Sequence, residues 1–306
     1  MDLNQLHAFV QTARHQGFAA AARVMELDPS QVSRQVAALE SSLGLRLFQR
    51  TTRRLSLTEA GHTYLARVGP LLDELAFAQE EAQSLARGVS GSLRMTTSIA
   101  FGHECIAPLL PTFRALHPQL RLELLMTDAN LRLVEDQVDL AVRMASRVEV
   151  NAVMTKLMPT RYHVCASPGY VQRAGQPLRP QDLALHDCML LTLPDYRHTW
   201  HFRPVGEAAA PGEAVNVQGG LSVSSPLVQR SCVLNGQGPA LLADWLAGPA
   251  LADGRLIDLF PDHQVSATGF NSAVWLLYPS RSYLPQKVRV MVDFLKANLA
   301  KEANGH

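Results

Sequence analysis

Lysine is scarce in this sequence of 306 residues: four of the 28 basic residues are lysines, and the first of them is Lys156. The formal net charge is +1, so the chain lacks the overall basic excess that would mark a nucleic-acid-binding protein by composition alone. Any contact with nucleic acid must therefore rest on local charge. Arginine can supply that charge, because its planar guanidinium matches phosphates and guanine edges.

Cysteine is scarce as well, and the four cysteines form no CxxC pair and no metal-type spacing: Cys105, Cys165, Cys188 and Cys232. This pattern excludes a disulfide framework and a zinc site. It predicts buried free thiols, with a redox pair such as Cys165 and Cys188 as an alternative. HExxH, GxSxG and Walker motifs are also missing, so we expect no catalytic residue, no metal and no cofactor.

Long apolar runs are missing too, and no stretch is long enough to span a bilayer. The first residues lack a basic segment followed by an apolar run, so no signal peptide is expected. We therefore expect a cytoplasmic protein with no membrane partner. The 47% hydrophobic content is nevertheless enough for a large core, and the length favours two or three folded units.

Three short helices are predicted at the N-terminus. Apolar residues from Leu3 to Val10 recur at helical spacing, and a second helix runs from about Phe18 to Met25. Asp28-Pro29 begins the third, because aspartate is a good N-cap and proline suits the first helical position. Gly44 is its expected C-cap. The second and third helices form a helix-turn-helix, and the third would enter the major groove by its N-terminal end.

The start of this third helix carries side chains that suit DNA recognition. They can donate or accept hydrogen bonds at base edges and phosphates, and a helix N-terminus favours phosphate. The candidate DNA-binding residues of this helix are Pro29, Ser30, Gln31, Ser33, Arg34 and Gln35.

A short hairpin, or wing, is predicted after the third helix. Apolar segments that end at Phe48 and begin at Leu55 flank a polar turn that carries Arg50, Arg53 and Arg54. Arginine in a wing can enter the minor groove or pair with phosphates, so these three residues complete the candidate interface. We expect residues 1–60 to form a DNA-binding domain whose partner is double-stranded DNA.

A long helix follows, from about Thr58 to Arg87. Its apolar positions step by three and four in a heptad seam that weakens toward the end: Leu65, Val68, Leu72, Leu75, Gln79, Ala82 and Ala86. Residues 61–90 are therefore predicted to be a linker helix with an apolar seam along it. Gly88 and Gly91 mark the next domain boundary.

Residues 91–306 alternate between strand and helix patterns, which indicates an α/β domain with mainly parallel sheets. Its length suits two lobes. Strands are predicted over 93–97, 120–126, 138–143, 162–166 and 274–278, and helices over 104–117, 131–137, 226–235 and 285–299. Gly236-x-Gly238 follows a helix rather than a strand, so it is not a dinucleotide-binding loop.

The N-terminal residues 3–62 closely resemble the DNA-binding domain of LysR-type transcriptional regulators. The matching strings are Leu6-His7-Ala8-Phe9, Ala21-Ala22, Val32-Ser33-Arg34-Gln35-Val36, Leu39-Glu40, Leu43 to Arg50 and Leu57-Thr58-Glu59-Ala60-Gly61. The resemblance continues through Gly91 to about Leu299. It implies a winged helix-turn-helix, a dimerising linker helix and a two-lobed effector domain like type 2 periplasmic binding proteins. A tetramer and contact with RNA polymerase are further expectations.

The sequence departs from the family pattern at two places. Glu26 stands at a turn position that glycine usually fills, where a left-handed backbone would cost roughly 1 kcal/mol. Pro29-Ser30 replaces the frequent Gln-Pro at the start of the recognition helix. The second change alters the expected operator sequence, while the docking mode stays as in the family.

The resemblance also implies where an effector binds: between the lobes, at strand ends and helix N-termini. Lobe I would comprise about 91–160 and 267–300, and lobe II about 161–266, with crossovers near Thr160-Arg161 and Val265-Ala267. Hydroxyls and free backbone N–H groups after the first strand suit a carboxylate, so a small anionic effector is expected. The candidate residues are Thr97, Ser98, Ile99, Ala100, Phe101, Thr127, Asp128, Arg143, Ser224 and Ser225.

Each of these residues has a plainer interpretation as a helix cap, and Arg143 as a structural group at the end of a buried strand. Three other functions compete with a ligand-responsive transcription factor. A thiol sensor would use the cysteines, a solute-binding protein would use the α/β domain alone, and an enzyme would need a catalytic constellation. The helix-turn-helix opposes the second, and the missing motifs oppose the third.

Overall fold

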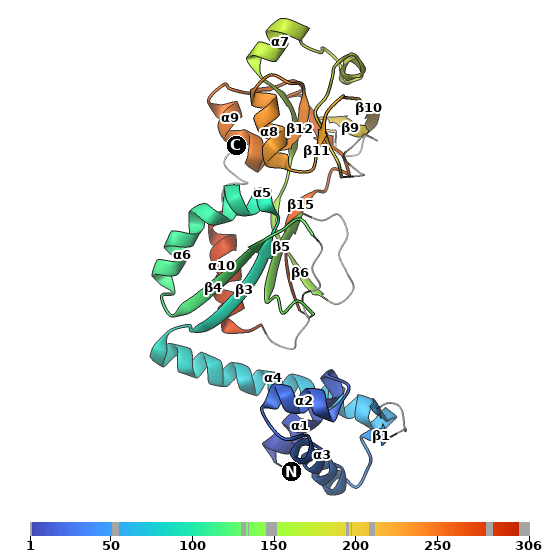
Figure 1. Ribbon diagram of the computed structural model, residues 1–306, viewed down its shortest axis with the longest axis vertical. Helices are drawn as coiled ribbons and strands as arrows, with labels where there is room; N and C mark the ends of the chain where they lie inside the picture. Colours follow the sequence, from blue (N-terminus) through green and yellow to red (C-terminus); the bar gives the residue numbers. More distant parts are fainter. Residues whose placement is uncertain are drawn as a thin grey trace. The chain divides into compact units, whose positions relative to one another are not determined.

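The computed structural model describes residues 2–50, 55–129, 133, 135–144, 152–193, 196, 198–207, 212–279 and 284–299 (Figure 1). The chain forms two compact units, one that ends at Gly88 and one that begins at Val89. Each is described by itself. Within the described ranges, none of the helices is both long enough and apolar enough to cross a membrane.

The first unit contains the predicted helices and wing. Its elements are α1 (Leu3–Arg14), α2 (Phe18–Met25), α3 (Pro29–Leu43), β1 (Phe48–Arg50), β2 (Leu55–Leu57) and α4 (Glu59–Arg87). The strands β1 and β2 pair antiparallel, with Phe48 opposite Leu57. The predicted arginines Arg53 and Arg54 lie outside the described residues, as does the side chain of Arg50.

The predicted N-cap and C-cap of α3 are confirmed. The carboxylate of Asp28 accepts a hydrogen bond from the N–H of Ser30 at 2.8 Å, and Pro29 stands at the first helical position. The side-chain oxygen of Gln31 accepts from the N–H of Asp28 at 3.3 Å, which completes a capping box that we had not expected. Gly44 ends the helix with φ of 68°.

The core of the first unit corrects the predicted heptad seam. Val68 and Leu72 are only 9% and 6% exposed, because they pack with Leu65 against the apolar cluster of α1 and α3. These three side chains therefore face the unit's own core and not a second subunit. Leu71 and Leu75 remain 68% and 39% exposed, and the side chain of Ala86 lies outside the described residues.

The second unit contains two sheets. In the first, which we call lobe I, the strand order is β4-β3-β5-β15-β6. The strands are β3 (Gly91–Thr97), β4 (Leu120–Met126), β5 (Leu140–Met144), β6 (Ala152–Pro159) and β15 (Ala273–Pro279). The strand β3 runs parallel to β4 and β5, so the carboxyl ends of these strands meet at one edge of the sheet.

Helices pack beside the sheet of lobe I. One continuous helical segment joins β3 to β4 and comprises α5 (Ile99–Phe101), a π-helical turn over Gly102–Ile106, a 3-10 turn over Ala107–Leu109 and α6 (Leu110–Leu116). It begins five residues before the predicted start at 104. The helix α10 (Gln286–Leu299) packs against α6 through Phe294 and Phe113, whose ring centroids are 5.1 Å apart. Of the helix predicted over 131–137, Leu133 and residues 135–137 form turns, and 131, 132 and 134 lie outside the described residues.

In the second sheet, which we call lobe II, the order is β10-β9-β14-β7-β12, and β13 also pairs with β7. Its strands are β7 (Tyr162–Ala166), β9 (Thr199–Pro204), β10 (Glu213–Asn216), β12 (Ala240–Ala243), β13 (Ile257–Asp258) and β14 (His263–Ser266). A separate parallel pair joins β8 (Leu190–Leu191) to β11 (Ser222–Val223). The helices are α7 (Pro168–Ala174), a 3-10 helix over Pro180–Leu185, α8 (Pro226–Leu234) and α9 (Asp244–Ala252).

The expectation of mainly parallel sheets is wrong. All the pairings in the lobe II sheet are antiparallel among the residues described, and β15 is antiparallel to both of its neighbours in lobe I. The prediction rested on strands alternating with helices. That alternation does not specify strand direction when the pairing partners, such as β7 and β14, are far apart in the chain.

The chain crosses between the lobes twice in its described part. It leaves lobe I between Pro159 and Tyr162, as predicted, and returns between Ser266 and Ala273. The second crossing was predicted at 265–267, but Val265 and Ser266 still belong to β14 because they pair with β9. The N–H of Thr160 donates to the carbonyl of Ser272 at 3.0 Å, so the two crossing segments are hydrogen-bonded to each other.

Candidate DNA interface and candidate effector site

The N-terminal end of α3 presents a polar surface. Pro29, Ser30, Gln31 and Arg34 are exposed, and Ser33 and Gln35 are half-buried. The Nε of Arg34 donates to the carbonyl of Ser30 at 3.3 Å. Hydrogen bonds from Ser30 hold the pKa of Asp28 below its ordinary value, so the N-cap stays charged at neutral pH. The predicted residues therefore share one end of one helix, although the capping box engages the side chain of Gln31.

The base of the wing is fixed by contacts that sequence reasoning missed. One carboxylate oxygen of Glu40, in α3, accepts from the N–H groups of Leu47 (2.7 Å) and Phe48 (3.0 Å). The N–H of Thr58 donates to the carbonyl of Leu47 at 2.9 Å. Gly61 passes so close that a Cβ there would lie 2.1 Å from that same oxygen. The wing is thus tied to the recognition helix on one side and to the start of α4 on the other.

The predicted effector residues of lobe I gather at the carboxyl edge of its parallel strands. Thr97 ends β3, Thr127 and Asp128 follow β4, and Arg143 lies near the end of β5. The hydroxyl oxygens of Thr97 and Ser98 are buried and have no hydrogen-bond partner within the described residues. A buried polar atom without a partner costs free energy, so these two hydroxyls are suited to a ligand that would supply one.

Arg143 is held at this edge by its own lobe. Its Nη2 donates to the hydroxyl of Thr96 at 2.9 Å, and its Nη1 donates to the carbonyl of Val142 at 3.1 Å. Burial lowers the pKa of this guanidinium, while the carboxylate of Asp128 opposes the change. Arg143 therefore brings a half-buried positive charge to the site as well as the structural role that the sequence suggested.

The prediction of free backbone N–H groups after β3 is partly wrong. The N–H of Ile99 donates to the carboxylate of Asp128 at 3.1 Å, because Asp128 lies beside the start of α5. Phe101 is 1% exposed and its ring meets that of Trp245, in lobe II, edge to face at 5.2 Å. Of the apolar residues predicted here, Ala100 is buried too, and Ile99 alone is exposed, at 42%.

Ser224 and Ser225 lie before α8 in lobe II. Ser225 is the N-cap of α8, but its side chain makes no capping hydrogen bond, and Ser224 is exposed. Within the part of the chain that the structure describes, we find no hydrogen bond from either serine to the lobe I residues. The structure therefore groups the lobe I candidates with one another.

An ion pair between the lobes was not foreseen from the sequence. Glu104, in the segment between β3 and β4, contacts Arg230 of α8 at 2.8 Å. A signal for it is hard to see in the sequence, because the two residues are 126 positions apart.

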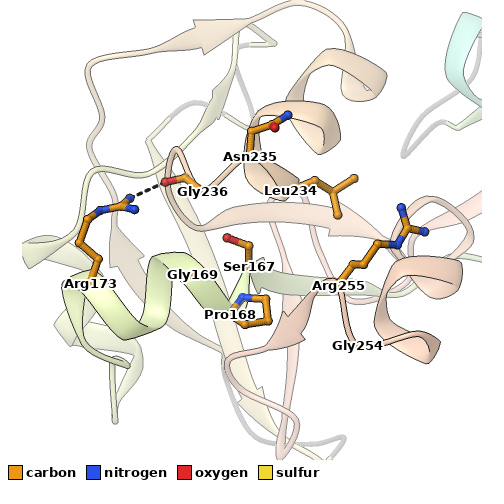
Figure 2. Close-up of a pocket in the computed structure, with 9 residues that line it drawn as sticks. All are labelled: Ser167, Pro168, Gly169, Arg173, Leu234, Asn235, Gly236, Gly254 and Arg255. Carbon is orange, nitrogen blue, oxygen red and sulfur yellow. Dashed lines mark hydrogen bonds between the residues drawn. The ribbon is translucent and has the colours of Figure 1, made fainter.

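A hollow of about 550 Å³ lies on lobe II (Figure 2). It is lined by Ser167, Pro168, Gly169, Arg173, Leu234, Asn235, Gly236, Gly254 and Arg255. Both of its arginines are engaged: Arg173 donates to the carbonyl of Gly236 at 2.6 Å, and Arg255 pairs with Asp253 at 2.7 Å. Since no predicted effector residue lines it, this hollow is separate from the candidate site.

None of the four cysteines forms a disulfide within the described residues. Burial raises the pKa of Cys188 to about 12 and raises that of Cys165 well above its ordinary value. Both thiols therefore stay protonated and unreactive near neutral pH. Across the described residues, no group of histidine, cysteine, aspartate or glutamate side chains is arranged to hold a metal ion.

A winged helix-turn-helix joined through a long helix to a two-lobed α/β unit is the architecture of a DNA-binding transcriptional regulator with an effector-binding domain. Family models identify the family: the LysR substrate binding domain matches residues 86–300, and the bacterial regulatory helix-turn-helix of the lysR family matches residues 3–62. The chain belongs to the LysR family of transcriptional regulators.

Relatives match along nearly the whole chain. The probable HTH-type transcriptional regulator LtrA of Klebsiella pneumoniae is 32% identical and covers 96% of this chain and 95% of its own. CrgA of Neisseria meningitidis serogroup C is 33% identical, with 98% of both chains covered. The solved structure of CrgA from Neisseria meningitidis, 31% identical, gives a TM-score of 0.61 over all of both chains. These matches show the fold as well as the family.

Proposed function

We propose that this regulator reads a specific DNA sequence with the N-terminal end of α3 in the major groove and with the wing against the adjacent backbone or minor groove. The contacts would come from Pro29, Ser30, Gln31, Ser33, Arg34 and Gln35, and from Arg50, Arg53 and Arg54 in the wing. The observation that supports the first set is their shared position at one capped and largely exposed helix end.

We further propose that a small anionic molecule binds between the lobes and shifts their closure, and that this rearranges the subunits on DNA. The buried hydroxyl of Thr97, without a partner in the described residues, supports this site best. Ser98, Thr127 and Arg143 would contribute from the same edge. Asp128 would orient the start of α5, and Ser224 and Ser225 would approach from lobe II.

The proposed division of labour has three parts: residues 1–60 bind DNA, 61–90 dimerise, and 91–306 bind the effector. A homodimer through α4, a tetramer of two such dimers and contact with RNA polymerase complete the proposed assembly. Because the partner DNA is the bacterial chromosome, we place the protein in the cytoplasm.

The DNA interface can be tested with duplexes selected from genomic fragments by the full chain. Arg34→Ala should weaken binding to the selected sequence by about 1–3 kcal/mol, with less effect on random DNA. Arg53→Ala should weaken binding to the selected sequence and to random DNA alike. It should also lower, by about 1, the steepness with which the logarithm of the binding constant falls with the logarithm of the salt concentration. Arg121→Ala, exposed on β4, is the control. Unchanged binding in both interface variants would contradict the proposed surface.

The effector site can be tested by thermal shift of the full chain with small carboxylates and with their neutral amides. A ligand at 100 times its Kd adds about 2.7 kcal/mol of stability. Thr97→Val removes a hydroxyl that has no partner, so the free protein should keep its Tm while the response to the ligand falls. Thr96→Val is the contrasting variant: its hydroxyl bonds to Leu125 and Arg143, so its Tm should drop.

Two results would overturn this proposal. Amides that stabilise the protein as well as carboxylates would contradict an anionic effector. A carboxylate response that survives Thr97→Val would place the site elsewhere.

A further inference from the structure

One contact between the lobes is an ion pair with two hydrogen bonds. Nη1 of Arg230 lies 2.8 Å from Oε2 of Glu104, and Nη2 lies 2.9 Å from Oε1. Guanidinium and carboxylate thus meet as two parallel forks, the geometry in which this pair is strongest. Glu104 belongs to lobe I and Arg230 to α8 of lobe II, so the pair spans the two lobes.

The pair is shielded from water. The side chains of Glu104 and Arg230 are only 16% and 23% exposed. Nη1 of Arg230 also donates to the carbonyl of Leu246, in α9, at 3.2 Å. Hydrogen bonds from Arg230 hold the pKa of Glu104 below its ordinary value against the effect of burial, and His103 contributes at 2.9 Å. The carboxylate of Glu104 is therefore charged at neutral pH.

An aromatic contact accompanies the ion pair. Phe101 lies three residues before Glu104, and its ring packs edge to face on Trp245 of α9 at an interplanar angle of 83°. The same short segment of lobe I thus contacts both α8 and α9 of lobe II. If the lobes separated, both contacts would be lost together, and both charges would become hydrated.

A second ion pair provides a contrast. Arg94 and Glu123 are 3.4 Å apart, 36% and 53% exposed, and both belong to lobe I. An exposed pair of this kind contributes little to stability. Removing one partner of a shielded pair is far more disruptive, because it leaves the other charge without a counterion.

We infer that Glu104 and Arg230 are positioning residues that latch lobe II to lobe I and so set the separation of the lobes at the proposed effector site. The latch itself requires no ligand. Its consequence for regulation rests on the proposed function: an effector would act on lobes that are already held together, and its response would depend on the strength of this pair.

The test measures acrylamide quenching of tryptophan fluorescence in the full chain. The Trp245 component is the difference between each protein and its Trp245→Phe counterpart. The variants are Glu104→Gln, Arg230→Met and the double variant, with Glu123→Gln as the control. Loss of charge-assisted hydrogen bonds should raise the ratio of separated to closed lobes about tenfold or more, so quenching of Trp245 should increase in both single variants.

The double variant separates a latch from a general structural role. Arg230→Met leaves the carboxylate of Glu104 shielded and unpaired, so adding Glu104→Gln should lower the quenching again. Two effects that simply add would contradict the latch. Single variants that change quenching no more than Glu123→Gln would overturn it as well.

A second measurement separates the latch from the proposed function. Duplex binding by the full chain, without any added small molecule, should change in Glu104→Gln and not in Glu123→Gln. Increased quenching with unchanged DNA binding would support the latch and count against control of DNA binding by lobe closure.

Discussion

Glu26 adopts a left-handed backbone, with φ of 52° and ψ of 40°, at the turn between α2 and α3. The sequence showed a glutamate where the family usually has glycine, and the structure shows that the glutamate takes the conformation of glycine. The N–H groups of Glu26 and Leu27 both donate to the carbonyl of Ala22, so the surrounding hydrogen bonds fix this turn. The strain is therefore localised at one residue.

Glu26→Gly should stabilise the first unit. Relief of the left-handed strain outweighs the added freedom of the unfolded chain, and the net gain should be about 0.5–1 kcal/mol. Urea unfolding followed by helical circular dichroism would measure it. Glu74→Gly is the matched control, because Glu74 is exposed inside α4, where glycine should cost about 1 kcal/mol. A loss of stability in both variants would show that Glu26 is not strained.

The two buried thiols allow a prediction on reactivity. Because burial raises the pKa of Cys188 to about 12, its thiolate is rare at pH 8, and Cys165 is 0% exposed. We expect a thiol reagent to label both only as lobe II unfolds, while the half-buried Cys232 reacts in the native protein. Labelling at pH 8 followed by mass spectrometry would check this. Native Cys188 reacting as fast as Cys232 would revive the thiol-sensor alternative.

At the scale of elements, the wing depends on a single carboxylate of the recognition helix. The carboxylate of Glu40 accepts hydrogen bonds from the N–H groups of Leu47 and Phe48, where β1 begins. A movement of α3 would therefore be passed to the wing, which links the two parts of the proposed DNA interface.

Glu40→Ala should cost about 1–3 kcal/mol, because two N–H groups lose their acceptor, whereas Glu40→Gln retains an oxygen and should cost less. If the wing is misplaced in Glu40→Ala, Arg53→Ala should then weaken DNA binding less than it does in the wild type. Unfolding curves of the wild type and the two Glu40 variants, and DNA titrations of Arg53→Ala in both backgrounds, would measure these effects. Equal effects of Arg53→Ala in the two backgrounds would contradict the role of Glu40.

The sequence predicted elements best where local signals were strong. The caps Asp28 and Gly44 gave α3 its ends, and apolar strings gave β4 and β7 their bounds. The short strands of lobe II, such as β8 and β13, have two residues each and carry no detectable period. They form because distant segments supply pairing partners, which a local pattern does not show.

The candidate site was predicted in part. The sequence grouped Thr97, Asp128 and Arg143, but it could not show that Asp128 bonds to Ile99 or that Glu104 contacts Arg230.

At the scale of the whole molecule, the exposed leucines of α4 indicate how two copies would meet. Leu71 and Leu75 lie one turn apart and stay exposed after Val68 and Leu72 have packed inward. Apolar side chains in adjacent turns of a long helix are suited to pairing with a second helix. The contact face in the proposed dimer is therefore rotated around α4 relative to the heptad seam predicted from the sequence.

Replacing both leucines, Leu71→Glu with Leu75→Glu, should convert the proposed dimer to a monomer, because carboxylates would be buried against each other in a paired helix. Sedimentation analysis would measure the mass. Leu116→Glu, at a residue 61% exposed in α6, is the control and should leave the mass unchanged. A double variant that still sediments with the wild-type mass would exclude this face of α4.

The two crossings decide how the second unit is connected. The chain leaves lobe I after Pro159 and re-enters it at Ala273, so lobe II is an insertion between two neighbouring strands, β6 and β15, of the lobe I sheet. Lobe I alone is continuous with α4. Replacing the inserted segment needs only two adjacent junctions, so the lobe II side of the proposed effector site can change in evolution while the lobe I side, which is continuous with α4, keeps its sequence.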